Sequence, residues 1–93
     1  MDKSYIEGLI KAKDIAKKMA DEHNANAEEA FNRLKTEFYP IPYSEHTEEQ
    51  KEERRLLQQT NNIECGKSIV LFDLVNTLWA EILKADMESR KAV

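Results

Sequence analysis

The stretch Ile69 to Leu83, IVLFDLVNTLWAEIL, decides how this 93-residue chain folds. Read as one helix, its apolar side chains cover an arc of roughly 220°, whereas a surface helix needs an apolar stripe of only about 100°. The members of this arc are Val70, Leu71, Phe72, Leu74, Val75, Leu78, Trp79, Ile82 and Leu83. Such a helix must contact at least two others, and a chain of this length has few to offer. The stretch therefore predicts self-association or a protein partner.

The predicted association surface lies on one part of this arc. We expect it to be formed by Phe72, Val75, Leu78, Trp79, Ile82 and Leu83. Asn76 stands at the edge of the arc, and a single polar amide beside an apolar core often fixes register or oligomeric state. Asn76 is therefore predicted to set the register or to contact a ligand. Asp73 shares a narrow polar face with Lys84 and is expected to face solvent.

Residues 4–38 predict a first long helix. Apolar or small residues recur three and four positions apart, which marks one face of a helix. They are Tyr5, Leu9, Ala12, Ala16, Met19, Ala27, Ala30, Leu34 and Phe38. His23 fills the gap in this stripe and is interpreted as a histidine at the edge of the core, with ligand binding as the alternative. The alanines would let a neighbouring helix approach closely.

Residues 39–43 contain two prolines in three residues and must end the first helix, because proline lacks the backbone N–H that a helix needs. Thr47 and Gln50 have the spacing of a capping box, which predicts that a second helix begins near Thr47. This helix either runs unbroken to Glu88 or breaks within residues 61–68, where two asparagines and a glycine weaken it. The sequence therefore predicts an all-α fold: residues 1–93 form a single helical domain, a long hairpin that assembles into a helical bundle.

Composition excludes several classes of protein. The net charge of −4 makes nucleic acid an unlikely partner, because such binders present a broad basic face. We expect no membrane span and no signal peptide, since no apolar run is long enough. Cys65 is the only cysteine and cannot form an internal disulfide, which favours a reducing cytoplasm.

The residues that support chemistry are few. Neither a Glu-x-x-His nor a His-x-x-x-His pair is present, so we expect no metal site, no cofactor and no catalytic residue. Glu49 and Glu52 are similar in spacing to the Glu-x-x-Glu pair with which small all-α nucleoside triphosphate pyrophosphatases hold magnesium. Those enzymes use a second acidic pair, and its counterpart here, Asp73 and Asn76, has only one carboxylate. A degenerate magnesium-dependent pyrophosphatase is therefore an alternative function.

The function that these observations favour is binding without chemistry. We expect a small cytoplasmic interaction or regulatory protein, of the inhibitor or adaptor type, that binds a protein partner through a helical bundle. It should form a homo-oligomer, in the simplest case a dimer. A second alternative is a bundle that binds a small ligand between its helices near His23, Asn76 and Trp79.

Overall fold

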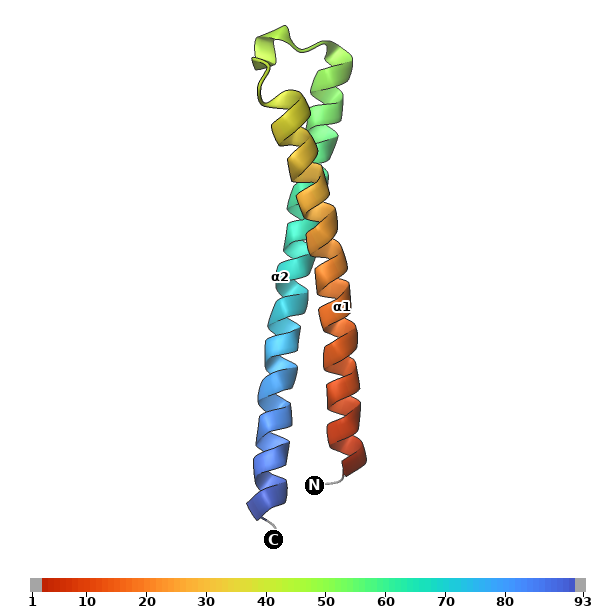
Figure 1. The fold of residues 1–93 in the computed structure, drawn as a ribbon, viewed down its shortest axis with the longest axis vertical. Coiled ribbons are helices and arrows are strands. Elements are labelled where there is room, and N and C mark those ends of the chain that lie inside the picture. Colours follow the sequence, from red (N-terminus) through yellow and green to blue (C-terminus); the bar gives the residue numbers. More distant parts are fainter. Residues whose placement is uncertain (1–2, 92–93) are drawn as a thin grey trace.

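The computed structural model describes residues 3–91 and shows two long helices that pack side by side (Figure 1). Helix α1 spans Lys3–Arg33 and continues as a π-helical turn, η1, over Leu34–Phe38. A single 3₁₀ turn, η2, covers Tyr43–Glu45, and α2 spans Glu48–Lys91. The first turn of α1 and the last turn of α2 lie at the same end of a rod that measures 70 × 16 × 15 Å (Figure 1). The predicted all-α helical hairpin is confirmed, and residues 3–91 contain no strand.

Helix α2 is unbroken over its 44 residues. Of the two predicted alternatives, the continuous helix is therefore right, and the break within residues 61–68 does not occur. A glycine costs a helix only about 1 kcal/mol, and in proteins most helical stability comes from packing against a neighbour. Because α1 lies along α2 through this region, packing outweighs the weak propensities of Asn61, Asn62 and Gly66.

The face of α2 that meets α1 follows a strict heptad repeat. Its buried and half-buried side chains recur at alternating steps of four and three residues. They are Leu57, Asn61, Glu64, Ser68, Leu71, Val75, Leu78, Ile82 and Ala85. An average step of 3.5 residues keeps one face of a helix turned toward a partner helix, as in a coiled coil. We call this intramolecular contact the seam.

Helix α1 contributes small side chains to the seam. Ala16, Ala20, Ala27 and Ala30 are all buried, and the next heptad position is held by Leu34 in η1. Three of these alanines, Ala16, Ala27 and Ala30, were predicted to lie on this face.

The stripe predicted for the first helix is only partly right. Tyr5, Ala12 and Met19 are exposed, so they lie outside the seam. The seam passes one residue further on, through the half-buried side chains of Ile6 and Lys13. Apolar periodicity did not predict this set of positions, because one of them is the charged residue Lys13.

The connection between the helices is held by local hydrogen bonds. The carbonyl oxygen of Phe38 accepts bonds from the backbone N–H of Ile41 at 3.1 Å and from Nε2 of His46 at 3.2 Å. The predicted capping box is confirmed: Gln50 N–H donates to Oγ1 of Thr47 at 3.1 Å, and Thr47 N–H donates to Oε1 of Gln50 at 2.8 Å. These bonds satisfy backbone groups that both helix ends would otherwise leave without partners.

Candidate interaction surface

The six residues of the predicted association surface separate into two groups. Val75 and Ile82 are only 7% and 5% exposed, and Leu78 is half-buried, so these three pack in the seam against α1. The hairpin itself therefore supplies the partner helix of these three residues, which are already covered within one chain. The other three remain open to solvent: Phe72 is 37% exposed, Trp79 47% and Leu83 56%.

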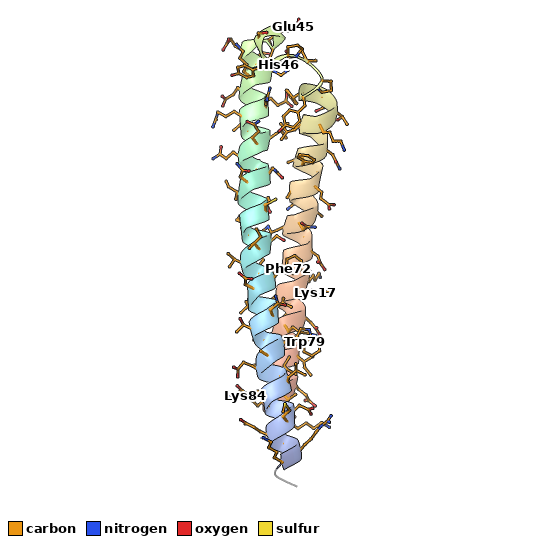
Figure 2. The ribbon with its side chains drawn as sticks, turned by 90° about the vertical axis from the view of Figure 1, so that its left-hand side faces the viewer. Lys17, Glu45, His46, Phe72, Trp79 and Lys84 are labelled. Atoms are coloured by element: carbon orange, nitrogen blue, oxygen red, sulfur yellow. The ribbon has the colours of Figure 1, made fainter. Side chains whose placement is uncertain are left out.

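These three belong to a continuous line of exposed side chains on α2. Ile69, Phe72, Asn76, Trp79 and Leu83 follow one another at steps of three, four, three and four residues, and all five are exposed. We call this line the outer stripe. It is displaced around the helix by roughly 100° from the seam. Figure 2 shows its two aromatic residues in the half of the rod remote from His46 and the connection.

Lys13 of α1 fixes the position of the largest side chain of the outer stripe. Its Nζ atom lies 4.4 Å from the centroid of the Trp79 ring, a cation–π contact worth about 0.5–1 kcal/mol at an exposed site. The same ammonium pairs with Oδ1 of Asp14 at 3.1 Å, and the Lys13 side chain is largely buried. The indole is therefore held against the hairpin while about half of its surface remains available for contact.

A second line of apolar side chains runs along α2 about 160° from the outer stripe. Val70 and Leu74 are exposed there. Exposed charged residues, Lys67 and Glu81, interrupt this line on either side of them. The outer stripe carries no charge between Ile69 and Leu83, and it is the more continuous apolar surface.

The structure does not bring together His23, Asn76 and Trp79, the three residues predicted to line a ligand pocket. His23 contacts Glu64, which precedes Asn76 by 12 residues, a distance of about 18 Å along a helix. A surface depression of about 400 Å³ beside His23 is lined by Lys67 and Val70 but not by Asn76 or Trp79. The predicted pocket is therefore not formed, and Asn76 lies exposed within the outer stripe.

His23 and Glu64 form a polar layer across the middle of the seam. Nδ1 of His23 donates a hydrogen bond to Oε2 of Glu64, and both side chains are mostly shielded from solvent. This bond, aided by the charge of the imidazole, a hydrogen bond from Asn26 and the charge of Lys67, lowers the pKa of Glu64 against the opposing effect of burial. His23 therefore lies at the core edge with a satisfied ring nitrogen, as the sequence predicted.

The carboxylates with the spacing of a magnesium site do not converge. Glu52 and Asp73 lie on the same helix 21 residues apart, which is about 32 Å. Oε1 of Glu52 pairs with Nη2 of Arg55 at 2.6 Å, and this hydrogen bond lowers the pKa of the carboxyl. Asp73 is exposed, as expected. Within residues 3–91, no group of three His, Cys, Asp or Glu side chains is placed to hold a metal ion.

A cluster of rings at the connection escaped the sequence analysis. His46 is 6% exposed and packs edge-on against Phe38 and Tyr43, with ring centroids 5.8 and 5.9 Å away. Cζ of Arg54 lies 5.1 Å from the Tyr39 ring and 5.2 Å from the Tyr43 ring. The available signal was the set of aromatic residues around two prolines, followed by Arg54 in the second turn of the next helix. We call these five residues the tip cluster.

No family model, curated protein or solved structure matches the chain. Neither helix, over the residues that the structure describes, contains an apolar segment long enough to cross a membrane.

Proposed function

We propose that this chain is a small, non-enzymatic, cytoplasmic interaction protein that acts by packing the outer stripe of α2 against another helical surface. The observation that carries the proposal is the exposure of Phe72, Trp79 and Leu83 in one uncharged line. Covering a Leu or Phe side chain stabilises a protein by roughly 1.5–3 kcal/mol. Aromatic residues are also enriched among those that dominate binding energy at interfaces.

The contact that best fits this surface is a helical bundle, because two helices of the hairpin already lie side by side next to the stripe. A homo-oligomer, in the simplest case a dimer, would cover the stripe without any further component. A protein partner of another sequence would cover the stripe in the same way, as expected for an inhibitor or an adaptor.

The two alternative functions have less support. A pyrophosphatase needs carboxylates that converge on magnesium and phosphate, whereas Glu52 and Asp73 are about 32 Å apart on one helix. A small-ligand site needs a concave pocket, and His23 contacts Glu64, about 18 Å along α2 from Asn76.

The test is site-specific photo-cross-linking in cells of the natural source. A benzophenone side chain is placed at position 83 of the outer stripe or, as a matched control, at position 84 on the polar face. We expect covalent products from position 83 and few or none from position 84. Both a product of two identical chains and a product with another protein would support the proposal. The absence of any product from position 83 would contradict it.

A further inference from the structure

The order of residues along the outer stripe indicates what covers it. Read from either end, the stripe runs aliphatic, aromatic, amide, aromatic, aliphatic: Ile69, Phe72, Asn76, Trp79 and Leu83. We propose that it pairs with the same stripe of a second copy, antiparallel, about a two-fold axis at Asn76. This inference depends on the proposed function, because it names the surface that the stripe binds.

An antiparallel pairing centred on Asn76 matches like with like. Ile69 and Leu83 are each seven residues from Asn76, so Ile69 of one copy lies level with Leu83 of the other. Phe72 and Trp79 are four and three residues away, so their rings are offset by about 1.5 Å along the axis and can interleave. A surface patch that complements itself in this way is the requirement for a two-fold symmetric dimer.

Asn76 gives this arrangement a preferred register. A side-chain amide has both donors and an acceptor, so two Asn76 side chains that meet at the axis satisfy each other. If one helix slides, each amide is buried against an apolar side chain and loses its partner. Leaving a buried polar group unpaired is unfavourable, which is why a single asparagine can set register in coiled coils.

The other end of the chain favours antiparallel over parallel pairing. Toward the connection, the same line on α2 continues at the same alternating steps through Cys65, Asn62, Gln58, Arg55 and Lys51. A parallel dimer would place these polar residues against their own copies along the whole rod. The antiparallel arrangement overlaps only residues 61–91 of each α2 and leaves Gln58, Arg55 and Lys51 in solvent.

The overlap is large enough for a stable dimer. Lys91 is 15 residues beyond Asn76, so the two copies overlap by about 30 residues, or about 45 Å. The rod is 16 Å wide. The face buried on each copy is therefore on the order of 700 Å², close to the roughly 800 Å² per partner of a standard stable interface. Lys13 adds no unpaired charge, since Asp14 neutralises it.

The native cysteine provides a direct test. Cys65 is the only cysteine in the chain and lies 11 residues from Asn76. In the proposed dimer, 22 residues of helix rise separate the two Cys65 positions, which is about 33 Å. Spin-labelled protein should give one dipolar distance near this value by double electron–electron resonance. A distance under about 20 Å would indicate parallel pairing and overturn the proposal.

Matched variants distinguish this surface from the second apolar line. Phe72→Ala should weaken dimerisation about tenfold or more, as expected for a residue that dominates an interface. Val70→Ala, which removes an exposed side chain from the other side of the same helix, should change it less than about twofold. The reverse ranking in sedimentation equilibrium would overturn the proposal.

Asn76→Leu provides the sharpest check of register. The variant should dimerise more tightly than the native protein, and its Cys65–Cys65 distance distribution should broaden or gain a second peak. An unchanged single peak would show that Asn76 does not set the register.

A monomeric protein that still gives cross-links from position 83 to another protein would refute this inference and leave the proposed function standing. A monomeric protein that gives no cross-links from position 83 would refute both this inference and the proposed function.

Discussion

The aromatic side chains at the two ends of the hairpin differ in what they contact. At the connection, every ring of the tip cluster has a partner within the chain: Phe38 and Tyr43 pack on His46, and Arg54 lies against Tyr39 and Tyr43. At the open end, Trp79 contacts Lys13 on one side and otherwise faces solvent. The rings at the connection contact one another or Arg54, although Tyr39 and Tyr43 are still 44% and 56% exposed, whereas Trp79 lies in an apolar line that is open to solvent.

The difference follows from the charged side chains that lie beside the apolar and aromatic residues in each half. Near the connection, Arg33 pairs with both Glu37 and Glu53, which ties η1 and α2 to the end of α1. Cationic side chains also lie over the exposed rings there, as Lys51 does over Tyr43. The outer stripe has no such flanking groups between Ile69 and Leu83 except Lys13 at Trp79. Concentration should therefore affect the stability of the two halves unequally.

The largest expected effect is that of Trp79→Ala at high protein concentration. In a dimer that buries the indole, the substitution should lower the free energy of unfolding by about 3–5 kcal/mol. Below the dimer dissociation constant, the loss should shrink to the contacts that the half-covered indole makes within one chain, of which the cation–π contact with Lys13 contributes about 0.5–1 kcal/mol. Urea unfolding followed by circular dichroism at two well-separated concentrations measures both values. An equal loss at both concentrations would show that Trp79 acts only within one chain.

Leu34→Ala should be nearly as destabilising but without dependence on concentration. Leu34 is 1% exposed, and removing a buried leucine side chain costs about 2–5 kcal/mol. Because the lost contacts lie within the hairpin next to the connection, dilution should leave the difference from the native protein unchanged. The same two urea titrations test this. A loss that grows with concentration would mean that the connection also takes part in association.

The polar layer in the seam predicts a smaller effect that depends on pH. The hydrogen bond from His23 lowers the pKa of Glu64 below its ordinary value of 4.5. The unfolded chain therefore takes up this proton first as the pH falls. The stability that the pair contributes is present above about pH 4.5 and is lost as the pH falls below it toward the folded pKa.

The urea concentration at the midpoint of unfolding should fall as the pH is lowered from about 6 to about 3.5. In Glu64→Gln this fall should be smaller than in the native protein. Glu52→Gln is the matched control, because the pKa of Glu52 is lowered by an exposed pair with Arg55. The control should retain most of the decline, since exposed ion pairs contribute little to stability. If the pH dependence of the urea midpoint is reduced equally in both variants, the pair of His23 and Glu64 contributes no more to stability than an exposed ion pair.

The smallest expected effect is on chemistry. Glu49→Gln, Glu52→Gln and Asp73→Asn should leave dimerisation unchanged, because Glu49 and Glu52 lie outside the overlap and Asp73 lies on the polar face beside the outer stripe. We expect neither saturable magnesium binding nor turnover of a nucleoside triphosphate panel in the native protein or in these variants. Micromolar magnesium binding that disappears together with turnover in Glu52→Gln would instead identify an enzyme.

Local signals in the sequence were sufficient for the elements of the fold. The paired prolines and the capping box act over a few residues, so the connection and the start of α2 could be predicted from Pro40, Pro42, Thr47 and Gln50. Both helices could be predicted from apolar periodicity. The continuity of α2 could not, because its weak central residues are compensated by α1, which lies far away in the sequence.

The division of the apolar arc was beyond sequence reasoning. An arc of about 220° is wider than one helix contact, so periodicity cannot tell which part meets α1. The structure resolves this through the antiparallel register, which places His23 opposite Glu64, 41 residues away. The tip cluster was missed for the same reason, since Arg54 meets Tyr39 only after the chain has reversed direction.

The unbroken course of α2 also sets a fixed span. Glu48 and Asn76 are 28 residues apart on one continuous helix, which is about 42 Å. In a dimer centred on Asn76, the two connections would stand about 84 Å apart at opposite ends of a stiff rod. A rigid spacer engages two sites at once only when their separation matches its length. Cargo fused to the connection would therefore bind bivalently to targets spaced near that distance, and targets much closer together would be bound one at a time.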